Sequence, residues 1–96
     1  MSDIVTWKII ITDENGKENS WETEGDILQQ DDDIAYLTKE GKVVLMVVKS
    51  SKMGMRVVKV GSDNWNYGNP AWVIKATKVH ISCGEISLLL YYNDHE

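Results

Sequence analysis

The residues of this chain best suited to chemistry are few, and their spacing argues against catalysis. His80 and Cys83 lie three positions apart in an apolar run, and residues at that spacing on a β-strand point to opposite faces. The pair therefore suits neither a cysteine–histidine nucleophile nor two ligands of one metal ion, unless a bulge near Gly84 turns one of them. We find no serine, base and orienting acid at a spacing that suggests acyl transfer. We expect no enzymatic activity, no metal site and no cofactor.

An uninterrupted acidic triplet is formed by Asp31, Asp32 and Asp33. Three adjacent carboxylates suit a divalent cation or the basic surface of a partner, but the Asp-x-Asp-x-Asp-Gly spacing of an EF-hand loop is absent. The alternative is a loop whose carboxylates are simply solvated. We carry the triplet forward as a candidate binding segment and expect no metal there.

Charge is divided unevenly along the sequence. Residues 1–40 carry 11 acids against three lysines, which gives −8, whereas residues 41–96 carry seven bases against four acids, which gives +3. An acidic face would speed and select encounter with a protein partner that has a basic surface. The alternative is that strands from both halves mix in space and dilute the asymmetry. The net charge of −5 argues against a protein that coats nucleic acid directly.

Aromatic residues gather in one glycine- and asparagine-rich segment, residues 62–72. Rigid aromatic side chains among asparagines are typical of binding surfaces. Trp65 and Tyr67, separated by Asn66, would project to the same side of an extended segment and could stack on a sugar ring, a base or an apolar protein patch. The alternative is that they cap the end of the fold, and Trp72, which begins an apolar run, suits the core. Trp65, Asn66, Tyr67 and Trp72 are the aromatic candidates for binding.

The elements that must position these residues are short runs rich in β-branched and aromatic residues. Asn15-Gly16, Glu40-Gly41 and Gly84-Glu85 separate neighbouring runs and predict hairpins. Glycines between the runs, Gly25 among them, are expected at turns that need positive φ. We therefore predict an all-β fold, a small antiparallel sandwich or barrel built from hairpins. The runs are Ile4–Thr12, Ser20–Thr23, Ile34–Thr38, Val43–Lys49, Met55–Val60, Ala71–Cys83 and Ile86–Tyr92.

Residues 26–40 also admit one short helix. Asp26 would be its N-cap and Gly41 its C-terminal stop. The apolar residues of this segment form only a ragged helical face, which Asp31 interrupts. A strand remains the other interpretation.

Two runs, Val43–Val48 and Ile86–Tyr92, are almost continuously apolar. Such a strand is normally buried on both faces, so Val43–Val48 is expected at the centre of a sheet. Two of these strands are difficult to cover within one small domain. A second copy of the chain would cover them, which makes a homo-oligomer an expected state.

Length and cysteine content limit the class of protein. The 96 residues suit a single domain, 1–96. No apolar run approaches the roughly 18–20 residues of a membrane-spanning helix. The N-terminus lacks the basic segment of a signal peptide, and a single cysteine fits a reducing compartment. We therefore expect a cytoplasmic protein with no membrane association.

These observations favour a small acidic, non-catalytic binding protein that acts stoichiometrically on a macromolecular partner. An inhibitor or adaptor of the kind that phages and other mobile elements encode would have this character. Two alternatives stay open. One is a small-molecule or carbohydrate-binding domain that uses Trp65, Tyr67 and Trp72, and the other is a structural subunit of a homo-oligomeric assembly.

Overall fold

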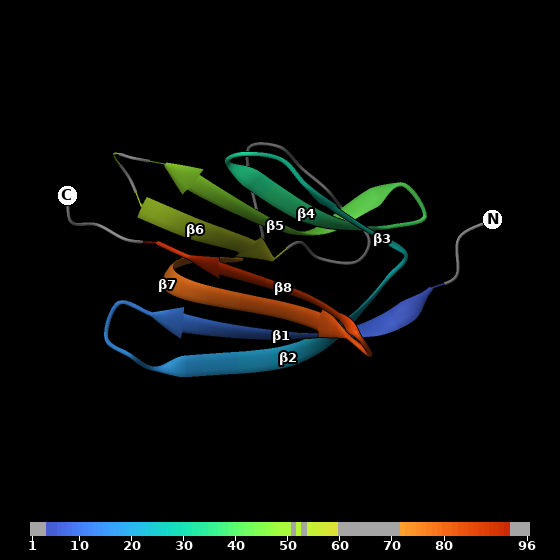
Figure 1. Ribbon diagram of the computed structural model, residues 1–96, viewed down its shortest axis with the longest axis horizontal. Helices are drawn as coiled ribbons and strands as arrows, with labels where there is room; N and C mark the ends of the chain where they lie inside the picture. Colours follow the sequence, from blue (N-terminus) through green and yellow to red (C-terminus); the bar gives the residue numbers. More distant parts are fainter. Residues whose placement is uncertain (1–3, 51, 53, 60–71, 93–96) are drawn as a thin grey trace.

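A computed structural model describes residues 4–50, 52, 54–59 and 72–92, with the side chains of residues 72 and 73 left out. These residues form one antiparallel sheet of eight strands, in the order β2-β1-β7-β6-β5-β4-β3, with β8 also paired to β7. Figure 1 shows β1 and β2 along one side, β4 and β5 along the other, and β7 and β8 between them. The strands are β1 (Val5–Asp13), β2 (Glu18–Gly25), β3 (Ile27–Gln30), β4 (Ile34–Lys39), β5 (Lys42–Ser50), β6 (Gly54–Lys59), β7 (Trp72–Cys83) and β8 (Ile86–Tyr91).

Turn residues fix the three hairpins that the sequence predicts. Gly16, with φ of 84°, closes a three-residue loop in which Asp13 accepts a hydrogen bond from the Gly16 amide. Glu40 and Gly41 both have positive φ, 53° and 82°, as a type I′ turn between β4 and β5 requires. Gly84 alone has positive φ between β7 and β8, which is the type II′ pattern. Each turn twists its strands in the direction that a sheet prefers.

One long strand, β7, belongs to both layers of the fold. Its first part pairs with β6 through Trp72–Ala76, and its second part pairs with β8 through Lys78–Cys83. Thr77 lies between the two parts as an extra residue opposite the Thr12–Asp13 step of β1. The Thr77 hydroxyl donates to the carbonyls of Thr12 and Asp13, 3.3 Å from each. Such a bulge bends a strand, so the sheet folds back on itself at Thr77.

A second crossing between the layers lies where β2 passes into β3. Gly25 ends β2, and its carbonyl accepts a hydrogen bond from the buried Trp7 indole at 3.2 Å. Asp26 then fixes the corner, because its backbone amide donates to the Thr38 carbonyl at 2.8 Å. Its carboxylate accepts from the Thr38 hydroxyl at 3.3 Å and from the Glu40 amide at 2.9 Å. Asp26 therefore ties the corner to the β4–β5 turn.

The core lies between the two layers. Alternate residues of five strands point inward, so that each strand buries one face and leaves the other outside. No charged residue belongs to the core among the residues that the structure describes. The buried hydrophobic residues are Trp7, Ile9, Ile11, Ala35, Leu37, Leu45, Val47, Met55, Val57, Ala76, Val79 and Ile81.

The predicted all-β antiparallel fold is confirmed, in the form of a sandwich-like sheet that does not close into a barrel. The helical interpretation of residues 26–40 is wrong, because this segment forms β3 and β4. β5 lies between β4 and β6, as its apolar sequence predicts. Only its Leu45 and Val47 are fully buried, however, and the intervening Met46 is half-buried.

The expectation that Gly25 lies in a turn with positive φ is wrong. Gly25 is a buried residue of β2 and is not among the residues with positive φ. A Cβ atom added at this position would lie 2.7 Å from Cγ and 2.8 Å from Cδ1 of Leu37. Leu37 is completely buried, so its side chain would have to shift within a packed core to accommodate that Cβ. Gly25 is therefore required by the close approach of β2 to β4.

We predict that Gly25→Ala lowers the free energy of unfolding by about 1–3 kcal/mol, because overpacking forces neighbouring groups out of place. Urea denaturation measures the loss. In a Leu37→Ala background the added methyl has space, so the same substitution should cost little. An equal cost in both backgrounds would show that contact with Leu37 is not the cause.

Candidate functional site

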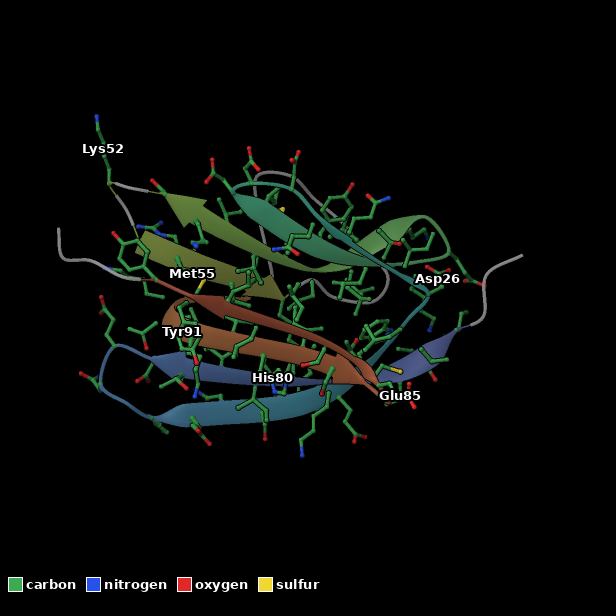
Figure 2. The ribbon with its side chains drawn as sticks, in the orientation of Figure 1. Asp26, Lys52, Met55, His80, Glu85 and Tyr91 are labelled. Carbon is green, nitrogen blue, oxygen red and sulfur yellow. The ribbon has the colours of Figure 1, made fainter. Side chains whose placement is uncertain are left out.

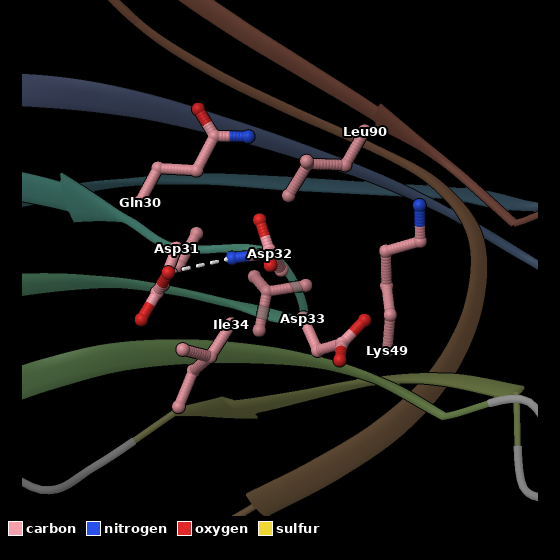
Figure 3. Close-up of a pocket in the computed structure, with 9 residues that line it drawn as sticks. Gln30, Asp31, Asp32, Asp33, Ile34, Lys49 and Leu90 are labelled. Carbon is pink, nitrogen blue, oxygen red and sulfur yellow. Dashed lines mark hydrogen bonds between the residues drawn. The ribbon is translucent and has the colours of Figure 1, made fainter.

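The acidic loop, Asp31–Asp33, joins β3 to β4 and is held by backbone hydrogen bonds. The Asp31 amide donates to the carbonyl of Ile34 at 2.8 Å, and the Lys49 amide of β5 donates to the carbonyl of Asp33 at 2.8 Å. The Asp32 amide donates to Oδ1 of Asp31 at 2.9 Å (Figure 3). All three aspartates are exposed. The loop thus presents three carboxylates from a fixed backbone.

Beneath the acidic loop lies a small hollow with an apolar floor. Ala35, Val47 and Leu90 contribute to it from β4, β5 and β8, and Lys49 lies at its margin (Figure 3). Its volume of about 10 Å³ admits roughly one water molecule. The hollow is therefore too small for an organic ligand, and the acidic loop offers a surface instead.

A wider depression adjoins the acidic loop on the outer face of the sheet. We call it the Tyr36 depression; it is open, encloses about 360 Å³, and is lined by Gln29, Gln30, Asp31, Ile34 and Tyr36. Gln29 and Tyr36 are direct cross-strand partners in β3 and β4. Asp31 lines both hollows, so a carboxylate stands beside an aromatic ring and two amides.

Sequence reasoning identifies the three aspartates but misses Gln29 and Tyr36. Their proximity depends on the pairing of β3 with β4, which the sequence leaves open between strands and a helix. The available signal is the alternation of Tyr36 with Ala35 and Leu37, which places the tyrosine on the face opposite the core once a strand is assumed.

Two acids of residues 1–40 form ion pairs, one with a lysine of the same segment and one with a lysine of the second half of the chain. Glu24 on β2 pairs with Lys39 on β4 at 2.8 Å, and Glu14 pairs with Lys75 on β7 at 3.2 Å. In the part of the chain that the structure describes, no ion pair includes a residue of the acidic loop. The loop therefore keeps its negative charge available to a partner.

The hydrogen bond and the charge of Lys39 lower the pKa of Glu24, and the same hydrogen bond raises the pKa of Lys39. A lowered carboxyl pKa stabilises the folded state above the unfolded-state pKa, and this contribution disappears as pH falls through the folded-state value. Both side chains are exposed, so salt should weaken the effect.

The aromatic candidates cannot be placed in the site. Trp65, Asn66 and Tyr67 lie outside the described residues. Trp72 begins β7, paired with Lys59 of β6, and its side chain is also outside the description. Their proposed role in binding stays a prediction.

His80 and Cys83 do lie on opposite faces of β7. The His80 side chain lies on the outer face of the sheet, where its Nε2 is 2.7 Å from the Ser87 hydroxyl oxygen. Cys83, in contrast, packs against the core. Across residues 4–50, 52, 54–59 and 72–92, no three His, Cys, Asp or Glu side chains are grouped to hold a metal ion. The same part of the chain contains no helix long and apolar enough to cross a membrane.

Comparison with known proteins returned no matching family model, no matching curated protein and no matching solved structure.

We predict that Lys39→Met raises the pKa of Glu24 toward its ordinary value, because the substitution removes both the hydrogen bond and the positive charge. A carboxyl NMR titration measures this pKa directly. Lys78→Met is the matched control, since it removes one charge on β7 away from Glu24. An unchanged Glu24 titration in Lys39→Met would contradict the assigned cause.

Proposed function

We propose that this protein is a non-catalytic binding protein that docks stoichiometrically on the basic surface of a protein partner. The acidic loop and the adjoining Tyr36 depression form the docking site. The observation that carries the proposal is the position of Asp31, which borders an open depression and lacks an ion-pair partner among the described residues.

Charge supports this proposal. Three exposed carboxylates on one short loop attract cations, and the loop's hydrogen bonds to β4 and β5 keep its backbone in place. A fixed loop loses little conformational freedom when a partner binds. Exposed charges of one sign also raise the rate of encounter with a basic surface.

The shape beside the loop suits a long basic side chain. An arginine or lysine of the partner could lie in the Tyr36 depression, with its charged end at Asp31 and its stem against Ile34. The Tyr36 ring would add a cation–π contact, and the amides of Gln29 and Gln30 would add hydrogen bonds. An inserted arginine would satisfy several of these groups at once.

The role of an inhibitor or adaptor fits this kind of site, because docking alone can block a surface of a larger protein or bridge that protein to another. An origin in a phage or another mobile element, and action in the cytoplasm, belong to the same proposal. The single thiol, Cys83, accords with a reducing compartment.

We predict that Asp31→Asn combined with Asp32→Asn weakens partner binding roughly twofold to thirtyfold, since exposed charge contacts contribute about 0.2–1 kcal/mol each. The measurement is quantitative affinity capture from lysate of the source cells, followed by titration of the captured protein. Binding should also weaken as salt rises.

The matched control is Glu18→Gln combined with Glu22→Gln, which changes net charge equally on the outer face of β2. The control should bind as the unmodified protein does. Equal weakening by both pairs would show that only net charge matters, and unchanged binding by both would place the docking surface elsewhere.

A further inference from the structure

The outer edge of β8 has no partner strand in the part of the chain that the structure describes. β8 pairs with β7 on one side only, and the sheet order assigns nothing to its other side. Figure 2 shows Glu85 and Tyr91 at opposite ends of this strand. An open edge presents backbone donors and acceptors that can bind another strand.

The hydrogen-bond pattern identifies which backbone groups lie on this open edge. The amide of Tyr92, directly after β8, donates to the carbonyl of Thr77 on β7 at 3.0 Å. Because backbone groups alternate between the two sides of an antiparallel strand, Leu88 and Leu90 also face β7. Ser87, Leu89 and Tyr91 therefore direct their N–H and C=O groups outward.

The side chains of β8 lack the features that normally protect an edge. Ile86, Leu89 and Tyr91 are 57%, 46% and 56% exposed, which makes β8 the richest strand in exposed large apolar residues. β8 contains no charged residue and no proline. The other outer strands differ, because β2 carries three glutamates and β3 has only four residues.

We propose that β8 pairs antiparallel with β8 of a second copy of this chain, about a two-fold axis at Leu89. The two sheets would join into one continuous sheet across the dimer. This inference is independent of the proposed function, since the acidic loop is on a different hairpin.

The register follows from the backbone pattern. With Leu89 opposite its own copy, each outward-facing residue meets another, so that Ser87 pairs with the partner's Tyr91. This is the arrangement that pairs all three outward-facing residues of each strand. Leu88 and Leu90, which pack toward the core, then meet each other, so apolar residues stay on matching faces of the joined sheet.

Charge at the two ends of β8 favours the antiparallel direction. Glu85 stands at the start of the strand, whereas Lys78 is the cross-strand partner of Tyr91 at its end. The exposed Lys52, between β5 and β6, lies near the same end, because Gly54, two residues later, approaches the Tyr92 ring. Antiparallel pairing brings Glu85 of each copy toward the basic end of the other.

A contact made through one strand edge is small compared with stable dimer interfaces. We therefore expect a dimer that dissociates on dilution. Sedimentation equilibrium from low micromolar to near-millimolar concentration should show the unmodified chain passing from monomer to dimer.

Leu89→Lys should raise the dissociation constant about tenfold or more, because it puts two like charges together at the two-fold axis. Ser20→Lys is the matched control, since it adds the same charge to an exposed position on β2. Circular dichroism establishes that both variants are folded. An unmodified chain that stays monomeric overturns the proposal and leaves the edge to an extended segment of a different protein. Equal dissociation constants for the two variants also overturn it.

Disulfide cross-linking tests the register, in a Cys83→Ala background that removes the native thiol. Leu89→Cys should cross-link to its own copy on oxidation, since the paired Cα atoms would be about 5.5 Å apart. Ile86→Cys is exposed to a similar degree but would be roughly 20 Å from its copy, and it should remain uncross-linked. Equal cross-linking at both positions, or none at position 89, contradicts this pairing.

Discussion

β7 has two edges but three partner strands, and the arrangement of the whole molecule depends on this constraint. β1 occupies one edge, while β6 and β8 share the other, end to end. A bend in β7 where these two partners meet directs β6 and β8 into different layers. Thr77 supplies that bend, because its extra residue interrupts the register and its hydroxyl satisfies two carbonyls of β1. The buried residues of β1 and β7 consequently face those of β4, β5 and β6 across one core.

The site and the open edge both follow from this bend. At one end of β8, Tyr92 reaches Thr77 and Gly54, and Leu90 comes to line the hollow beneath the acidic loop. The loop is fixed from the other layer, by the bond from Lys49 to Asp33. Because the described residues place no strand beyond β8, its second edge is open to the intermolecular contact that we propose.

Local signals in the sequence predict the hairpins, whereas contacts distant in sequence decide the rest. Asn15-Gly16 and Glu40-Gly41 identify turns because only certain residues tolerate positive φ. The roles of Gly25 and Asp26 depend on Leu37 and Thr38, which reach them only after the layers form. The same limit applies to the site: the aspartates are visible as a run, but Tyr36 joins them only through its pairing with Gln29.

Amide hydrogen exchange followed by NMR tests most directly whether the bend in β7 leaves β8 with one paired and one open edge. In dilute solution the amides of Leu88 and Leu90 should exchange slowly, and those of Ser87, Leu89 and Tyr91 should exchange fast. On concentration the fast group should become protected while the slow group stays unchanged. Uniform protection of β8 in dilute solution, or amides of Ser87 and Leu89 that stay fast in concentrated solution, would contradict this account.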